Sequence, residues 1–198
     1  MTEFFSKSIS LQSKGLILQI GFCVTLVISL WSLKGSRKWF LVGWGLTITT
    51  IIISILRIIT QQNFLFYPSV IIFLIFCVLS IKIATEDVIL SGEITLNRLI
   101  GSICIYLLIG TTWAILNFLL ESVSPNSFSG ITAEHYSNTL QEFFYYSFVT
   151  LTTLGYGDTL PVKPTARAFA YLEAVSGVLY LALLVASLVG SYLTKNRS

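Results

Sequence analysis

Residues that could carry catalysis or bind a metal are scarce in this 198-residue sequence. Charged residues make up 11% of it, and the one histidine, His135, falls in a polar stretch where we expect it to be solvated. The three cysteines, Cys23, Cys77 and Cys104, have neither metal-site spacing nor a pairing pattern, which indicates small apolar packing residues. The sequence therefore predicts neither an enzyme nor a cofactor.

The sequence also lacks a basic cluster of the kind that binds a nucleic-acid backbone. Its 12 lysines and arginines exceed its 9 acidic residues by three and are scattered, so we expect no nucleic-acid partner. No segment has arginine or lysine at every third position, the pattern by which a voltage sensor moves charge through the membrane field. Strong voltage sensing is therefore not expected.

Hydrophobic residues are abundant, at 55% of the sequence, and the mean hydropathy is +0.83. Because a helix needs about 20 apolar residues to cross a bilayer, five stretches are predicted to span it. They are Leu16–Leu33, Trp39–Thr60, Phe66–Ile83, Leu99–Leu120 and Ala168–Leu193. A sixth, Leu140–Thr152, is too short to span and is predicted to be re-entrant. Thr139 and Glu142 form a T-x-x-E pattern at its start, which predicts a capping box with Thr139 as the helix cap.

The most informative stretch is Thr150 to Asp158, which reads T-L-T-T-L-G-Y-G-D. Backbone carbonyls can replace the water around a cation if they point at one axis, which requires alternating left- and right-handed residues. Gly155 and Gly157 allow this, because glycine adopts a positive φ without steric cost. Tyr156 must then point away into the protein, while Asp158 places negative charge at one mouth.

Six of these positions match the signature T-x-x-T-x-G-Y-G-D, and the sequence thereby resembles the potassium channel family. The resemblance implies that potassium ions bind to oxygens of Thr153, Leu154, Gly155, Tyr156 and Gly157 and pass down their electrochemical gradient. Leu154 replaces the usual valine, which leaves the carbonyl unchanged. The alternatives are a weakly selective cation channel and a non-conducting membrane scaffold or regulatory subunit.

The resemblance also implies residues that support the filter. Asp158 lies at its outer end, and Tyr145 and Tyr146 occupy positions where the family often has two tryptophans that brace the filter tyrosine. Interfacial aromatics are the alternative for these two tyrosines. Glu173, an acid within a spanning helix, is expected to support the filter by hydrogen bonds or by pairing with Arg57.

In the last helix, Gly177 lies where the family often has a glycine at which the inner helix bends. Close helix packing is the alternative explanation for this glycine. Leu181, Val185 and Val189 follow it at i, i+4 spacing, so they are expected to line an apolar inner cavity.

The predicted fold is an all-α membrane protein with five transmembrane helices and a re-entrant pore helix followed by the filter. Residues 1–97 form a three-helix region, and residues 98–198 form a pore domain of outer helix, turret, pore helix, filter and inner helix. The polar loop Ala84–Asn97 separates the two. One filter motif and no internal repeat predict a homotetramer.

Basic residues predict the orientation of the chain. Lys34, Arg37 and Lys38 share a five-residue loop, which the positive-inside rule places in the cytoplasm. The N-terminus is then outside and the C-terminus cytoplasmic, in a multi-pass protein of the plasma membrane.

Overall fold

The computed structural model describes residues 66–90, 96–131 and 136–195, together with residues 45, 48, 49, 52, 53 and 56, which are helical. By its contacts the chain divides into two compact units, Met1–Phe76 and Cys77–Ser198. The predicted span Leu16–Leu33, most of Trp39–Thr60, Arg57 and His135 lie outside the described residues. The functional boundary between residues 97 and 98 stays a prediction.

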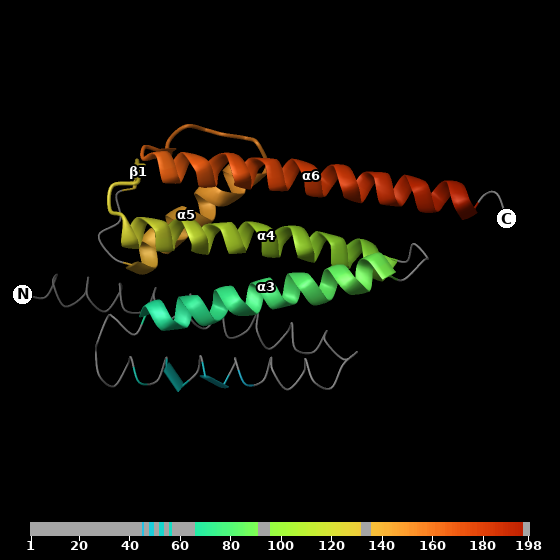
Figure 1. The fold of residues 1–198 in the computed structure, drawn as a ribbon, viewed down its shortest axis with the longest axis horizontal. Coiled ribbons are helices and arrows are strands. Elements are labelled where there is room, and N and C mark those ends of the chain that lie inside the picture. The colour runs from blue at the N-terminus through green and yellow to red at the C-terminus, as the bar shows by residue number, and fades with distance from the viewer. Residues whose placement is uncertain are drawn as a thin grey trace, which may run out of the picture. The chain divides into compact units, whose positions relative to one another are not determined.

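Four helices and two short strands make up the continuous described part (Figure 1). They are α3 (Phe66–Leu90), α4 (Leu96–Val123), β1 (Phe128–Ser129), α5 (Tyr136–Leu151), β2 (Leu160–Pro161) and α6 (Pro164–Lys195). Three stretches within the described residues are long and apolar enough to cross a membrane, namely Phe66–Glu86, Leu99–Val123 and Pro164–Gly190. The chain is therefore a predominantly helical, multi-pass membrane protein.

Several helix boundaries differ from those predicted. α3 continues to Leu90 and α4 begins at Leu96, so the polar loop predicted for Ala84–Asn97 is shorter. Residues 84–90 contain no glycine or proline to end the helix, and Gly92 is the first helix breaker after Ile83. α5 begins at Tyr136, so Thr139 lies inside the helix and its predicted role as the helix cap is wrong.

α5 packs against both α4 and α6. Its 16 residues would extend about 24 Å, less than the hydrocarbon core of about 30 Å. Most side chains buried in these three helices are apolar, and they include Ala114, Ile115, Phe118, Leu140, Phe143, Leu151 and Ala166. Burial of apolar surface is worth about 25 cal/mol per Å² where it removes that surface from water. It holds α5 against two helices of the same chain.

Polar side chains join α4 to α6 along their length. Trp113 Nε1 donates to Ser176 Oγ at 3.0 Å, and the Tyr180 hydroxyl donates to the Ser102 carbonyl at 2.6 Å. The rings of Tyr106 and Tyr180 lie 5.9 Å apart. These contacts hold the two long helices alongside each other, and α5 packs against both of them.

The loop after α4 folds onto the segment before α6. Glu121 accepts hydrogen bonds from the backbone N–H groups of Asn126, Ser127 and Phe128 at 2.7, 2.9 and 3.1 Å. β1 then pairs with β2 in antiparallel register, with Phe128 opposite Pro161. This pairing fixes the position of the chain immediately after the glycine motif.

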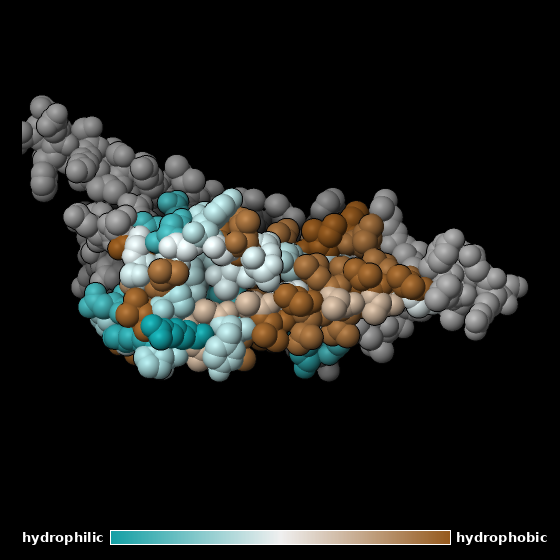
Figure 2. Space-filling model, turned by 90° about the horizontal axis from the view of Figure 1, so that it is seen from above, coloured by the Kyte–Doolittle hydropathy of each residue, from teal (hydrophilic) through white to brown (hydrophobic). Residues whose placement is uncertain are grey.

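The surface of the described residues divides by polarity (Figure 2). On the face shown, hydrophilic residues gather toward the end that carries β1, and apolar residues cover the part toward the C-terminal end of α6. Exposed apolar side chains of α6 include Leu179, Leu183 and Val185. Such a surface fits lipid or other protein and not water.

Candidate functional site

The segment Thr152–Asp158 leaves the C-terminal end of α5 and is exposed in the single chain. Backbone hydrogen bonds join its first residues to the last turns of that helix. The N–H groups of Leu154 and Gly155 both donate to the Val149 carbonyl, at 2.9 and 3.2 Å, and Thr153 N donates to the Thr150 carbonyl at 2.9 Å. The buried helix therefore positions the start of the segment.

The backbone of this segment alternates in handedness. Thr153, Gly155 and Gly157 have positive φ angles of 59°, 57° and 80°, whereas Leu154 and Tyr156 between them do not. The two glycines thus have the left-handed conformation that their positions predicted. The sequence did not indicate it for Thr153, because a β-branched residue pays about 1–3 kcal/mol to adopt it.

This alternation has a chemical consequence. A strand that alternates in this way can turn successive carbonyl oxygens toward one side, where they replace the water around a cation that prefers oxygen ligands. The preceding helix adds to the effect, because its C-terminal end carries partial negative charge. Thr153 to Gly157 are therefore suited to hold a dehydrated monovalent cation.

The two tyrosines expected to brace the filter have different surroundings. The Tyr145 ring stacks on the Tyr156 ring, with centroids 6.4 Å apart and planes 7° apart, and its hydroxyl donates to Asp158 Oδ2 at 2.6 Å. Tyr146 is buried and its ring contacts Phe128 and Phe143. Tyr145 is thus placed beside the filter, and Tyr146 lies in the core behind it.

We expect Tyr145→Phe to make conduction more sensitive to acid. The Tyr145 hydroxyl bond lowers the pKa of Asp158 below its ordinary value, so the phenylalanine variant should raise that pKa. Because the folded-state pKa of Asp158 is depressed, the hydrogen bond from Tyr145 stabilises the folded protein above the pKa that Asp158 has in the unfolded chain. This contribution to stability is lost as pH falls through the folded-state pKa. The measurement is a pH titration of cation flux together with the carboxyl NMR signal of Asp158.

The matched control is Tyr171→Phe, which removes a tyrosine hydroxyl from α6 at a position that is 60% exposed. This variant should leave both titrations unchanged. An Asp158 titration that does not move in Tyr145→Phe would show that the hydrogen bond does not set the charge at the mouth.

Glu173 is fully buried and lies between three helices. Asn117 of α4 donates through Nδ2 to Glu173 Oε2 at 3.0 Å and to Ser147 Oγ of α5 at 3.2 Å. All three residues have an exposed fraction of 0%. Sequence reasoning selected Glu173 and missed Asn117 and Ser147. The signal for Asn117 is a polar amide within an apolar span.

Gly177 packs directly against the end of α5. A Cβ at this position would overlap the carbonyl oxygen of Leu151 and lie 3.0 Å from two atoms of its side chain. Gly110 of α4 also lies close to α5, since a Cβ there would lie 2.8 Å from the Phe148 ring. The structure thus contains the contact that close packing requires, while bending at Gly177 stays a prediction.

The three residues predicted to line a cavity lie on an open face of α6. Leu181, Val185 and Val189 are exposed in the single chain, and Gly177 is buried. This placement leaves the three side chains free to face a pore axis. Their role as cavity lining stays a prediction.

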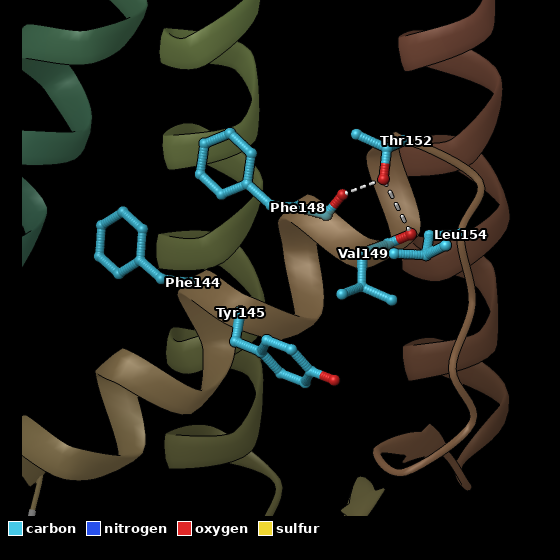
Figure 3. Close-up of a pocket in the computed structure, with 6 residues that line it drawn as sticks. All are labelled: Phe144, Tyr145, Phe148, Val149, Thr152 and Leu154. Atoms are coloured by element: carbon cyan, nitrogen blue, oxygen red, sulfur yellow. Dashed lines mark hydrogen bonds between the residues drawn. The ribbon is translucent and has the colours of Figure 1, made fainter.

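A pocket of about 440 Å³ opens beside the filter (Figure 3). Its lining comes from α5 and the first filter residues, namely Phe144, Tyr145, Phe148, Val149, Thr152 and Leu154. The Thr152 hydroxyl is turned back to its own helix, where it donates to the Phe148 carbonyl at 2.7 Å (Figure 3). The pocket is therefore lined mainly by apolar and aromatic groups.

Comparison with known proteins agrees with this geometry. Residues 99–195 match the ion channel family. Over 87 residues the chain is 34% identical to the A-type voltage-gated potassium channel KCND3 of Rattus norvegicus and of Homo sapiens, which covers 44% of this chain and 13% of each relative. Over 59 residues it is 36% identical to potassium voltage-gated channel subfamily A member 10 of Mus musculus, covering 30% of this chain and 12% of that relative.

The chain thus spans a small part of the length of these relatives, and no solved structure matches it. The matched residues contain nearly all of α4 and the whole of α5, the filter segment and α6. Residues 99–195 are therefore similar to the channel domains of this family, and the resemblance of the chain to potassium channels is confirmed.

Proposed function

We propose that this protein is a potassium-selective channel, in which carbonyl oxygens of Thr153, Leu154, Gly155, Tyr156 and Gly157 bind potassium ions in single file. The observation that carries the proposal is the alternation of positive and ordinary φ angles from Thr153 to Gly157. Such a backbone replaces the hydration shell of a cation with carbonyl dipoles, which is how potassium filters conduct. The relatives bearing the names of potassium channels support the choice of ion.

Four identical chains would complete this filter around a fourfold axis. Each chain contributes one filter segment, and a ring of carbonyls around an ion needs more than one strand. In the single chain Leu154 is 55% exposed and Tyr156 is 67% exposed, and the pocket beside them is open. Packing of a neighbouring copy would cover these apolar groups.

The remaining parts of the chain fit the same proposal. Asp158, held by Tyr145, would form a ring of carboxylates that attracts cations at the outer mouth. The C-terminal end of α5 would point partial negative charge toward ions below the filter. We propose five transmembrane helices in a plasma membrane, an outside N-terminus, a cytoplasmic C-terminus, and no cofactor other than the potassium ions themselves.

Reconstitution of the purified chain tests this proposal. The assembly in detergent should have four times the 22.0 kDa mass of one chain, and liposomes that contain it should release potassium. Selective conduction by a dimer would contradict the fourfold filter. A tetramer without cation flux would favour a scaffold or regulatory subunit, and equal sodium and potassium flux would favour a weakly selective channel.

A further inference from the structure

The cluster of Asn117, Ser147 and Glu173 has an imbalance between hydrogen-bond donors and acceptors. Both N–H groups of the Asn117 amide are used, one on Ser147 Oγ and one on Glu173 Oε2. Among the described residues, two buried oxygens then have no partner, and they are Asn117 Oδ1 and Glu173 Oε1. A buried acceptor without a donor is costly, so a further hydrogen atom shared between these two oxygens would stabilise the cluster.

The two unpaired oxygens belong to the two side chains that are already hydrogen-bonded to each other. A carboxyl group and a carboxamide can face each other through two parallel bonds, in which the amide N–H donates to one carboxyl oxygen and the acid O–H donates to the amide oxygen. The first of these bonds is present at 3.0 Å. A proton on Glu173 Oε1 would supply the second and satisfy both oxygens.

The surroundings also favour a neutral Glu173. Its exposed fraction is 0%, no described residue places a cation beside it, and burial disfavours the charged carboxylate. Among the described residues, α4 contributes the neutral Asn117 to this site, and α5 contributes Ser147 and the titratable Tyr146. On α6 itself, Ser176 Oγ donates to the Glu173 backbone carbonyl and not to the carboxyl group.

We propose that Glu173 carries a proton on Oε1 and donates it to Asn117 Oδ1, so that the two side chains form a neutral acid–amide pair that positions α5 through Ser147. The pair joins α4 to α6, and the second N–H of Asn117 reaches Ser147 one turn before Leu151, where α5 ends. Glu173 and Asn117 are thus positioning residues for the filter. Removal of the proton at alkaline pH places an uncompensated negative charge behind the filter.

Infrared difference spectroscopy tests the protonation of Glu173 without any need for conduction. The spectrum of the wild-type protein minus that of Glu173→Gln at neutral pH should contain a carboxylic-acid carbonyl band. As a matched control, Glu86→Gln removes an exposed acid from α3, and its difference spectrum should contain carboxylate bands instead. Carboxylate bands alone for Glu173→Gln would overturn the proposal and indicate a buried water between the two oxygens.

The expected effects of this pair on potassium flux rest on the proposed channel activity. Glutamine keeps both bonds of the pair, because its N–H replaces the acid O–H, so Glu173→Gln should retain potassium flux within about twofold. Glu173→Leu and Asn117→Leu lose both bonds and should lower flux or tetramer stability about tenfold or more. Wild-type flux should decline at alkaline pH, while Glu173→Gln should not follow that decline.

The infrared and the flux measurements distinguish a failure of the neutral pair from a failure of the proposed channel function. An acid band with no potassium flux leaves the pair intact and contradicts the channel function. A Glu173→Gln variant that loses flux as severely as Glu173→Leu, or that keeps the alkaline decline, overturns the positioning role of the neutral pair even if the wild-type protein conducts.

Discussion

Replacing Gly155 or Gly157 with alanine is expected to abolish selective potassium conduction. Both residues have positive φ angles, 57° and 80°, in which a Cβ costs about 1–2 kcal/mol. A Cβ at either position meets no atom within 4 Å in the single chain, so the penalty comes from the backbone conformation itself. In a fourfold filter the cost is paid in every subunit, about 4–8 kcal/mol in total.

Gly190→Ala is the matched control for this experiment. Gly190 lies in α6 with no positive φ angle, and a Cβ there meets no atom within 4 Å. This variant should conduct like the wild type. Alanine variants at both filter positions with an unchanged ratio of potassium to sodium permeability would show that the alternating backbone does not form the filter.

Replacing Gly177 with alanine is expected to have the next largest effect. The added Cβ would overlap the Leu151 carbonyl oxygen at the end of α5, so α6 must move away from the helix that carries the filter. Overpacking of this kind costs about 1–3 kcal/mol per site. The folded protein should therefore lose thermal stability, and potassium flux should fall about tenfold, as measured by a melting scan and by efflux from liposomes.

The result also separates close packing from bending at Gly177. If the glycine serves only as a hinge, alanine should change the fraction of time that the channel is open and leave the melting temperature unchanged. If close packing is its role, both stability and flux fall together, and Gly190→Ala again serves as the control.

The sequence predicted the parts of the site whose chemistry depends on neighbours along the chain. Gly155 and Gly157 were predicted to be left-handed from the residue type alone. Thr153 has the same conformation but could not be identified, because its residue type disfavours a positive φ and the hydrogen bond of its N–H to the Thr150 carbonyl appears only in the structure. A local motif therefore indicates the conformation only where the residue type permits it.

Contacts between helices could not be predicted in this way. Glu173 was selected because an acid in an apolar span is costly, yet its partner Asn117 lies 56 positions earlier, and nothing in the sequence relates the two. Tyr145 and Tyr146 are adjacent and looked equivalent, but α5 turns one toward Asp158 and the other toward Phe128. The two tyrosines lie on different faces of α5, and only the packing of the helix determines what each face contacts.

The helices themselves were located from apolar runs with errors at their ends. The stretch Leu99–Leu120 corresponds to α4 and Ala168–Leu193 to α6, each of which extends a few residues farther at both ends. Hydropathy marks the part of a helix that lies in lipid, whereas the helix continues into polar residues until a breaker or a cap ends it. The three N-terminal stretches were predicted by the same reasoning, and of these only the third is continuously described.

Selection of potassium by the segment Thr153–Gly157 can be measured in the purified protein. The most direct test is the reversal potential of the purified protein in a planar bilayer with potassium on one side and sodium on the other. We predict a reversal potential near the potassium equilibrium value, with current carried almost entirely by potassium. A reversal potential near zero, with sodium carrying as much current as potassium, would contradict the account.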